Sequence, residues 1–549
     1  MTDLTVPDLL EAIADASGDY VCLVDGASRL TWVELRSRVR RFANMLAESG
    51  IGIRNERSAL ADSESGQDHV ALMLRNRAEY LEAMLGSFCA RATSFNVNFR
   101  YTAGELRSML ADARPSAIVV ATEFAPVVGE ALVDRDPVVV LQVDDGGDGP
   151  LLPGAWWYHD VMAATSDAPG RSDWSPEDLY MLFTGGTTGR PKGVLWRQAD
   201  ALVSAFGISP RDGTEYASAQ EAAAAAVARL GRRVCAPTPP FIHGASQWFA
   251  IGCLLGGGRV VIPEETGTFR PDHLLELVEQ ETLTEVMIVG DAFGRPLVEE
   301  VERHPRSFPS LRSIVNGGAA LSETVRERLL AALPATRIVD NMGSSESGRQ
   351  ASRQFTRAGE ARDLEALKGN VVLSSDRTRL LSRGEDELGW LARAGRVPIG
   401  YLGDAEKTEA TFPTVAGIRY AVPGDRARLR ADGMIEFVGR DSSTINTGGE
   451  KVFAEEVEEV LRSHPSVRDA IVVGRPSEKW GQEIVAVVAV EDGLTDEELV
   501  AHVAVRLARY KLPKRIVRVE TVPRTPAGKA DLRAAQVLCA GAGEDVHTR

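Results

Sequence analysis

Short runs of apolar residues alternate along most of the chain with longer stretches in which apolar residues recur at helical spacing. The short runs, rich in β-branched residues, are typical of buried strands, and the longer stretches are typical of amphipathic helices. Strands that alternate with helices favour mainly parallel sheets. The pattern therefore predicts an α/β fold, with strands at residues 20–24, 70–74, 117–121, 138–143, 179–183, 259–262, 285–289 and 313–318, and helices at residues 32–46, 102–113, 217–228 and 272–281.

The alternation changes in three places. Residues 54–69 are polar and lack a clear periodicity, so we expect an exposed loop there. The glycine-rich and charged segment 383–403 predicts a smaller, more β-rich region. From residue 451 onward the pattern predicts a compact α+β domain of about a hundred residues. Its expected helices are residues 454–462 and 496–507, and its expected strands are residues 469–473, 483–490 and 515–519.

The most informative segment follows the predicted strand 179–183 and reads Thr-Gly-Gly-Thr-Thr-Gly-Arg-Pro-Lys-Gly at residues 184–193. Glycines let backbone N–H groups approach phosphate oxygens closely, the threonine hydroxyls add donors, and Lys192 adds a compact positive charge. The spacing is that of neither a Walker A loop nor a Gly-x-Gly-x-x-Gly dinucleotide turn. A flexible loop without a ligand is the alternative. The ordered string of ten residues favours a polyphosphate-binding loop.

Composition and charge narrow the class of protein. At 549 residues the chain is long for one core, so two or more domains are expected. A net charge of -16 disfavours binding to nucleic acid or anionic lipid, so phosphate binding must rely on local donors and metal. The five cysteines are scattered and form no Cys-x-x-Cys pair, which indicates neither a zinc site nor a disulfide framework. With no signal peptide and no apolar run of membrane-spanning length, we expect a cytoplasmic protein without an integral membrane segment.

Six motifs, in one order along the chain, resemble those of the adenylate-forming superfamily of acyl-CoA synthetases, non-ribosomal adenylation domains and luciferases. They are the loop at residues 184–193, Asn-Gly-Gly-Ala at 316–319, Asn-Met-Gly-Ser-Ser-Glu at 341–346, Val-Pro-Gly-Asp-Arg at 422–426, Gly-Arg at 439–440 and Thr-Pro-Ala-Gly-Lys at 525–529. The resemblance implies a large N-terminal domain, residues 1–439, of α/β subdomains and a β-rich subdomain. A small mobile α+β C-terminal domain, residues 440–549, would follow a hinge near Ser442.

The resemblance also implies the chemistry. Attack of a carboxylate on the α-phosphate of ATP develops negative charge, which nearby cations must neutralise. Lys529 would contact the carboxylate and α-phosphate, and Glu346 would ligate Mg²⁺, a cation that prefers oxygen ligands. Thr184, Lys192 and His243 would complete the catalytic set. Each of these residues alone is better read as a solvated or structural side chain, and the ordered set of motifs reverses that reading in favour of a functional role.

The remaining roles are likewise implied by the motifs. Asp425 would accept hydrogen bonds from the ribose hydroxyls, and Arg440 would serve ribose or phosphate. The acyl pocket would include Phe241, His243, Trp248, Gly317 and Ala319, although ordinary core packing is the alternative for Phe241, Trp248 and Ala319. The nucleotide (ATP, then AMP) and coenzyme A would contact Thr184, Gly185, Gly186, Thr187, Thr188, Gly189, Lys192, Gly317, Gly318, Ala319, Asn341, Met342, Gly343, Ser344, Ser345, Asp425 and Arg440, with Gly448, Gly449 and Lys451 beside the pantetheine arm of CoA.

Three positions depart from the superfamily pattern. Ser442 stands at the hinge where Asp or Lys is usual, Met342 replaces an aromatic residue that stacks on adenine, and the polar stretch 54–69 has no counterpart. The departures at Ser442 and Met342 suggest that the chain belongs to a subgroup of the superfamily. Residues 196–198, 343–346 and 445–451 most resemble actinobacterial acyl-CoA synthetases of the FadD type, which act on steroid side-chain acids and have relatives that take terpenoid acids.

The resulting hypothesis is an ATP- and Mg²⁺-dependent acyl-CoA ligase for a bulky hydrophobic acid such as a steroid, polycyclic terpenoid or long-chain acid. Aryl and medium-chain acids stay open. One rival is an enzyme that only thioesterifies a preformed acyl-AMP with CoA, which would require a partner adenylating enzyme. Others are an adenylating enzyme that loads an acyl carrier protein and a non-catalytic nucleotide-binding regulator. A homodimer is also left open.

Overall fold

Two sheets rich in parallel strands form the centre of the N-terminal part in the computed structural model. The structure describes residues 3–133, 138–147, 149–184, 191–210, 212–264, 269–357, 365–366, 369–447, 450–477, 481–491, 493–525 and 528–541. The larger sheet has parallel inner strands and antiparallel edges, in the order β16 (Glu365–Ala366), β15 (Gly348–Phe355), β14 (Arg337–Ser344), β13 (Ser313–Gly317), β12 (Glu285–Ile288), β10 (Val234–Pro237), β11 (Arg259–Ile262), β1 (Val21–Asp25) and β2 (Ser28–Thr31). The smaller sheet is parallel throughout, in the order β4 (Thr93–Asn96), β3 (His69–Met73), β5 (Pro115–Ala121), β6 (Val139–Val143) and β7 (Trp156–Trp157). The predicted α/β class and all eight predicted strands are confirmed, β8 in a sheet described below.

Helix α3 (Ala78–Cys89) lies between these two sheets. It contacts β1 of the larger sheet and β3 and β4 of the smaller one, and all of its residues are buried. Helices α2 (Trp32–Glu48) and α4 (Ala103–Ala113) begin with a Thr–Glu capping box, at Thr31 and Thr102, which satisfies backbone donors at the first turn. They match the predicted helices 32–46 and 102–113, and α8 (Ala219–Val227) and α10 (Pro271–Gln280) match the other two.

Two smaller sheets connect the centre to the C-terminal part. The first is a hairpin of β8 (Leu179–Thr184) and β9 (Lys192–Arg197), with β19 (Gly400–Tyr401) added along β9. The second contains β20 (Thr414–Val415), β21 (Ile418–Ala421), β18 (Gly389–Ala394), β22 (Asp425–Leu429) and β23 (Ile435–Arg440), with β17 (Asn370–Leu373) paired to β18. This is the β-rich region that the segment 383–403 predicted, and it extends on both sides of that segment.

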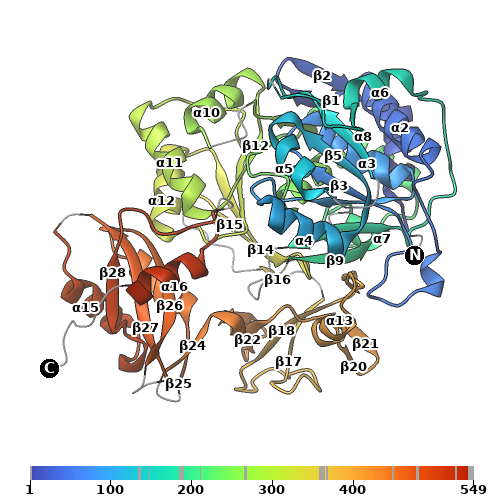
Figure 1. The fold of residues 1–549 in the computed structure, drawn as a ribbon. Coiled ribbons are helices and arrows are strands. Elements are labelled where there is room, and N and C mark those ends of the chain that lie inside the picture. The colour runs from blue at the N-terminus through green and yellow to red at the C-terminus, as the bar shows by residue number, and fades with distance from the viewer. Residues whose placement is uncertain are drawn as a thin grey trace.

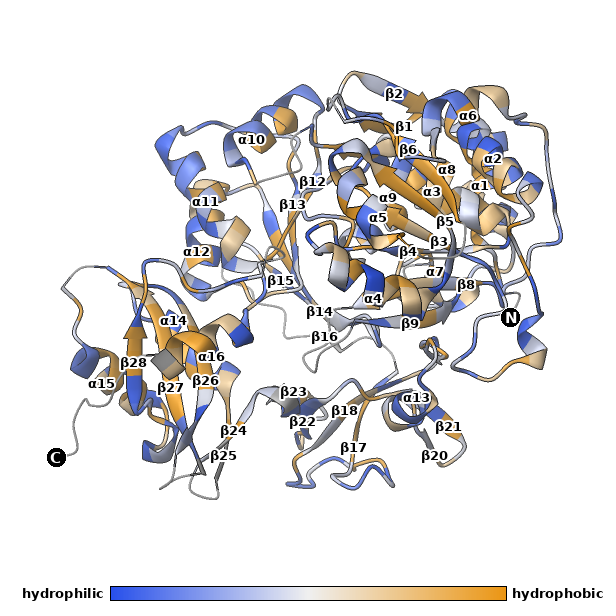
Figure 2. Cartoon of the chain, in the orientation of Figure 1, coloured by the Kyte–Doolittle hydropathy of each residue, from blue (hydrophilic) through white to orange (hydrophobic). Residues whose placement is uncertain are grey.

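The C-terminal unit has its own sheet and its own cores. Strands β25 (Glu450–Phe453), β24 (Thr444–Thr447), β27 (Gly481–Val490), β26 (Val467–Ser477) and β28 (Arg515–Arg518) pack with α14 (Ala454–Arg462), α15 (Asp496–Arg506) and α16 (Leu532–Gly541). Figure 1 shows this unit, in orange to red, beside α11 (Gly290–Arg303) and α12 (Glu323–Ala332). Figure 2 shows hydrophobic residues concentrated on β26 and β27, as on β3 and β5. The predicted α+β character of this part is confirmed.

Residues 54–65 form a largely exposed loop, as predicted, but the end of the predicted stretch is buried: Gly66 and Gln67 are buried, and His69 is the buried first residue of β3. The loop is pinned at its base and at its tip. Ile53 forms a β-bridge with Gln67, and the Gly403 N–H donates to the Ser63 carbonyl at 2.8 Å. Arg91, almost fully buried, pairs with Glu56 at 2.9 Å. Within the part of the chain that the structure describes, no helix is long and apolar enough to cross a membrane.

Candidate active site

A cavity of about 1240 Å³ lies between the larger sheet, α9 (Gly244–Leu254) and the C-terminal unit. Its walls include the carboxyl ends of β13 and β14, where the chain leaves the sheet and ligand sites of α/β folds form. The structure brings eleven of the predicted site residues to this cavity: Thr184, His243, Trp248, Gly317, Gly318, Asn341, Met342, Gly343, Ser344, Ser345 and Lys529.

The strand ends present bare backbone toward the C-terminal unit. Asn316 and Asp340 are register partners on β13 and β14, and the Asn316 amide donates to the Asp340 carboxylate at 2.7 Å. Gly318, with φ of +90°, then turns the chain in a conformation that favours glycine. A Cβ atom placed at Gly318 would lie 3.9 Å from Cε of Lys529. The side chain of Lys529 therefore reaches van der Waals distance of the chain at the end of β13.

Gly343 sits at a β-bulge in the β14–β15 hairpin, and we expect Gly343→Ala to destabilise the protein. A Cβ atom at this position would stand 2.2 Å from the Gly348 carbonyl oxygen, so the hairpin would have to shift. Forced overpacking of this kind typically lowers the free energy of unfolding by about 1–3 kcal/mol. Urea unfolding measures the effect. The matched control is Gly104→Ala in α4, where the Cβ meets nothing within 4 Å and a small stabilisation is expected.

Glu346 and Lys192 both lie near Tyr401. The Tyr401 hydroxyl donates to Oε1 of Glu346 at 3.0 Å, and the Lys192 ammonium lies 5.8 Å from the centre of the Tyr401 ring. Lys192 also pairs with Asp404, which holds the pKa of that carboxyl below its usual range. Thr184 and Lys192 are register partners on β8 and β9, so the hairpin holds the two ends of the predicted phosphate loop together.

Asp425 and Arg440 form an ion pair across the β22–β23 hairpin. Their Nε–Oδ1 distance is 3.1 Å, and they are direct register partners. Asp425 is 5% exposed. Burial raises the pKa of Asp425, and the positive charge of Arg440 opposes that rise. The hairpin thus holds an acceptor carboxylate next to a multi-donor guanidinium, as the predicted ribose-binding roles require.

Lys529 enters the cavity from the C-terminal unit. Its carbonyl accepts from the Thr525 N–H at 2.7 Å, which closes the turn that carries the side chain. Burial lowers the pKa of Lys529, the charge of Arg440 lowers it further, and Glu346 opposes both. The ammonium group is therefore desolvated and placed among the other predicted nucleotide-binding charges.

Three buried polar atoms on the cavity wall have no hydrogen-bond partner among the described residues. They are Nε2 of His243, Oδ1 of Asn341 and Oγ1 of Thr525. Buried polar groups in folded proteins are almost always hydrogen-bonded, so orphaned atoms around one cavity indicate a ligand site. One donor or acceptor comes from each of three elements: the start of α9, β14 and the turn before Lys529.

His243 is expected to make stability depend on pH. Burial, together with the charges of Lys529 and Arg100, lowers the pKa of His243 to about 3. In the unfolded chain the pKa returns to about 6.5, so between pH 6.5 and 3 only the unfolded state gains the proton. Its contribution to stability is complete above pH 6.5 and is lost as the pH falls toward 3, by up to about 1.4 kcal/mol per pH unit.

Urea unfolding of wild type and His243→Asn at pH 7.5 and 5.5 measures the contribution of His243 to the pH dependence of stability. The variant should lose less stability on acidification than wild type. The interval from about pH 8.5 to 7.5 supplies the control, since the His243 imidazole is then neutral in both states and the two proteins should change stability equally. Parallel curves for wild type and His243→Asn would show that the imidazole does not titrate as described.

Some predicted site residues lie elsewhere. Phe241 is fully buried against Tyr80, with ring centroids 5.2 Å apart, and does not line the cavity. Ala319 packs on the core beneath α11 and α12, and its carbonyl accepts from Asn316 at 3.0 Å. Gly185, Gly186, Thr187, Thr188, Gly189, Gly448 and Gly449 lie outside the described residues. Lys451 lies on β25, and Ser442 lies between β23 and β24.

Tyr401, Asp404, Asn316 and Asp340 were not predicted as site residues. The Gly-Tyr-Leu-Gly-Asp run at 400–404 contains the first two, and its two glycines and its acid are the signal that could have drawn attention to it. Asn316 begins a motif that the resemblance did include, but its amide side chain was not given a role. Asp340 directly precedes a recognised motif, and nothing else in its local sequence marks it.

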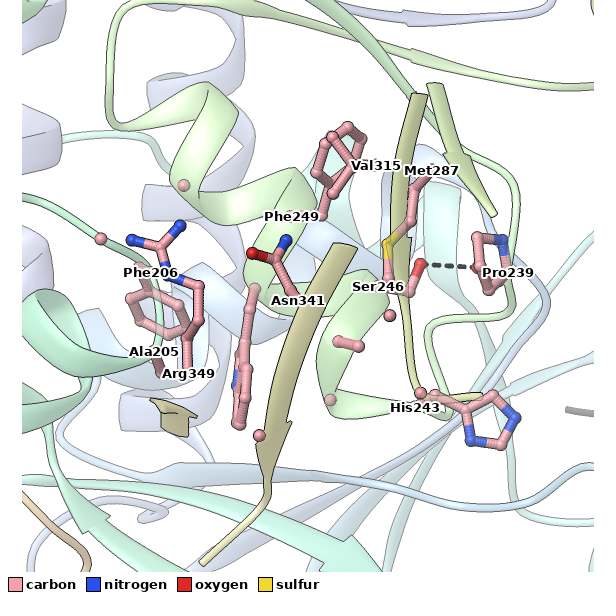
Figure 3. A pocket seen from close by; sticks show the side chains of 18 of the residues that line it. Ala205, Phe206, Pro239, His243, Ser246, Phe249, Met287, Val315, Asn341 and Arg349 are labelled. Carbon is pink, nitrogen blue, oxygen red and sulfur yellow. Dashed lines mark hydrogen bonds between the residues drawn. The ribbon is translucent and has the colours of Figure 1, made fainter. Parts of the chain in front are cut away.

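The acyl part of the cavity extends along α9. Trp248 donates from Nε1 to the Tyr180 hydroxyl at 3.1 Å and packs edge-on against Trp196, so its indole is fixed on the wall. Figure 3 shows His243 at one side of this space and Phe206 with Arg349 at the other, with Asn341 between them. A carboxylic acid can therefore place its carboxylate near His243 and Lys529 and its body along the helix. The fold and site define an enzyme that activates a carboxylate with a nucleotide.

Comparison with known proteins agrees with this class. Residues 10–372 match the family described as AMP-binding enzyme, and residues 456–529 match the AMP-binding enzyme C-terminal domain. The medium-chain acyl-CoA ligase Mig of Mycobacterium avium is 44% identical, over 97% of this chain and 98% of its own. The 3-oxocholest-4-en-26-oate–CoA ligase of Rhodococcus rhodochrous is 34% identical, over 97% of this chain and 95% of its own. The structure of the anthranilate CoA ligase AuaEII with anthranoyl-AMP superposes with a TM-score of 0.79 at 20% identity, covering 98% of both chains.

The chain belongs to the AMP-binding enzyme family, the adenylate-forming superfamily. The predicted superfamily and the resemblance to actinobacterial acyl-CoA synthetases are confirmed, as is the predicted class of AMP-forming acid–thiol ligase. The predicted requirement for ATP and CoA follows from that class. The residue roles stay predictions.

Proposed function

We propose that the protein joins a hydrophobic carboxylic acid to CoA through an acyl-AMP, with a medium-chain, long-chain or steroid acid as substrate. The observation that carries this proposal is one continuous cavity whose wall includes both Lys529 and Trp248. The names of the relatives from Mycobacterium avium and Rhodococcus rhodochrous, a medium-chain ligase and a ligase of a steroid acid, support the same substrate classes.

In the first half-reaction the acid's carboxylate attacks the α-phosphate of ATP, and pyrophosphate leaves. Lys529 neutralises charge on both reacting groups, while Lys192 and Thr184 hold the phosphate end. Asp425 and Arg440 hold the ribose end. In the second half-reaction the CoA thiolate attacks the acyl-AMP and AMP leaves, after the C-terminal domain, residues 440–549, turns about Ser442 to present Gly448, Gly449 and Lys451. This boundary and hinge remain proposals.

The residues present fit a magnesium ion held by one carboxylate. Glu346 has Oε1 engaged by Tyr401, and no described residue bonds its Oε2. No group of three or more acidic, histidine or cysteine side chains in the described ranges could enclose a metal, which suits Mg²⁺ because it is usually held by one or two carboxylates with phosphates and water. When bound, Mg²⁺ would neutralise charge on the ATP phosphates. We place the reaction in the cytoplasm, where ATP and CoA are available.

A panel of acids tests the proposal. Purified protein is incubated with ATP, Mg²⁺ and CoA plus medium-chain, long-chain, aryl or steroid acids, and both pyrophosphate and CoA esters are measured. We expect both products with an apolar acid. Consumption of synthetic acyl-AMP without pyrophosphate release from ATP would instead assign only the second half-reaction. Transfer to a holo-carrier protein but not to CoA would assign a loading enzyme, and ATP binding without any product would assign a regulator.

A further inference from the structure

The cavity wall carries far more positive than negative charge. Among the described residues that line it, Lys529 and seven arginines stand against one acid, Glu285. The whole chain has a net charge of -16, so overall composition does not account for this excess. Removing a cation from water is unfavourable unless an anion or a hydrogen-bond acceptor replaces the lost hydration. The nucleotide phosphates account for Lys529, but not for arginines at the other side of the cavity.

Arg349 is the arginine whose surroundings are most specific. It stands near the start of β15, opposite Gly343, and its guanidinium points into the cavity beside Phe206 (Figure 3). Its Nη2 lies 3.9 Å from the Cβ position of Gly207. Throughout the described ranges, no carboxylate and no other side chain bonds the Arg349 guanidinium. Arg233, by contrast, pairs with Glu285 at 2.7 Å.

The neighbours of Arg349 add positive charge. Desolvation lowers the pKa of Arg349, and the charge of Arg233 lowers it further. Arg393 donates to the carbonyl oxygens of Ser347 and Arg349 at 2.6 and 2.7 Å, and burial together with the charge of Arg349 lowers the pKa of Arg393 to about 10. Of these three guanidinium groups, Arg233 has the Glu285 carboxylate as a partner, whereas no carboxylate among the described residues pairs with Arg349, which lines the cavity.

The length of helix α9 gives the distance between Arg349 and the end of the cavity where the carboxylate of the acid would react. His243 caps the first turn of α9, and Gly252 lies nine residues further along. A Cβ atom at Gly252 would stand 2.3 Å from the Phe206 carbonyl, so Gly252 marks the level of Phe206 and the adjacent Gly207. A rise of 1.5 Å per residue places this level roughly 13 Å from His243 along the helix. Arg349 therefore faces the far end of an acid whose carboxylate lies at His243.

We propose that Arg349 is a specificity-determining residue that recognises an oxygen acceptor, a keto or carboxylate oxygen, at the far end of the acid. The proposal rests on the proposed ligase function, because it takes the carboxylate to lie at the His243 end. A guanidinium offers a planar set of donors that suits either oxygen. A plain alkyl end would leave the guanidinium without a partner, whereas a distal oxygen would satisfy it and displace water from the wall.

Three acids of equal chain length test the proposal: an alkanoic acid, the acid with a keto group one carbon from its end, and the α,ω-dicarboxylic acid. We expect wild type to form CoA esters from at least one oxygenated acid with a higher kcat/KM than from the alkanoic acid. Arg349→Met, which keeps the length and removes the donors, should lose that preference by roughly 10- to 100-fold. Its kcat/KM for the alkanoic acid should stay close to that of wild type. Arg349→Lys should keep part of the preference, and Arg430→Met, at an exposed surface arginine, should behave as wild type.

A preference for either oxygenated acid supports the proposal. Which of the two acids is preferred shows whether Arg349 recognises a keto oxygen or a carboxylate. Equal kcat/KM for all three acids in wild type, or an equal loss on all three in Arg349→Met, would overturn it. Calorimetric titration of the same acids into wild type and Arg349→Met, without ATP, separates this outcome from failure of the ligase function. If no acid is turned over, tighter binding of an oxygenated acid by wild type alone still supports the Arg349 assignment, and equal binding by both proteins rejects it.

Discussion

Lys529→Ala is expected to lower pyrophosphate release from acid and ATP by about 10²- to 10³-fold, the usual effect of removing one preorganised group that stabilises transition-state charge. Among the described residues that line the cavity, Lys529 is the lysine, and burial has already removed much of the hydration of its ammonium group. Its ammonium therefore needs no rearrangement of water when negative charge develops. Consumption of synthetic acyl-AMP with CoA should fall far less, because that step does not form the mixed-anhydride bond between the carboxylate and the α-phosphate.

Lys511→Ala is the matched control in the same unit. Lys511 pairs with Glu456 at 2.6 Å and is outside the cavity lining, so its loss should leave both half-reactions intact. The pH profile gives a second readout. Since the pKa of Lys529 is lowered, pyrophosphate release should decline on the alkaline side at a lower pH than an ordinary lysine would cause. A Lys529→Ala enzyme that keeps most of its adenylation rate would contradict the role assigned to this residue.

Glu346→Gln should raise the Mg²⁺ concentration needed for half-maximal activity by about 100-fold, since even outer partners of a metal ligand contribute 10- to 100-fold to affinity. The substitution keeps the size of the side chain and its bond from Tyr401 while removing the charge. Tyr401→Phe removes the hydroxyl that orients the carboxylate at 3.0 Å and should raise the same concentration by about tenfold.

Titration with Mg²⁺ at saturating ATP measures both effects. Tyr420→Phe provides the comparison, because Tyr420 packs in the apolar core with Leu373 and Val415. Its Mg²⁺ curve should match that of wild type. If Glu346→Gln lowered maximal activity without moving its Mg²⁺ curve, Glu346 would act on the nucleotide by another route.

The sheet strands were predictable because strands buried on both faces are continuous apolar runs, and the capped helices were predictable from Thr–Glu pairs at their starts. Helix α9 escaped prediction for the opposite reason. It is apolar almost all round and buried along most of its length, so it has no polar face to reveal a helical period. Helix α11 contains Pro296, which argues locally against a helix that tertiary packing nevertheless retains.

The motifs located the nucleotide side of the site, because each is a short local segment with its own chemistry. Contacts between segments could not be predicted in the same way. The approach of Lys529 to Gly318 depends on how the C-terminal unit packs against β13. The pairing of Asn316 with Asp340 depends on strand register, and the hydrogen bond from Tyr401 to Glu346 joins two sheets. Arg349 lies only three residues after Glu346, but nothing in its local sequence shows which way its side chain points.

The positive cavity wall inside an acidic protein has a kinetic consequence. ATP, CoA and a carboxylate are all anions, and at a distance they meet the field of a chain with net charge -16. Only within about one Debye length, ~8 Å at physiological ionic strength, does the arginine-lined wall dominate the force on them. Salt therefore weakens the outer repulsion more than the inner attraction, because enclosed charges are screened least. Ionic strength in this enzyme should govern how fast its substrates arrive more than how firmly they are held.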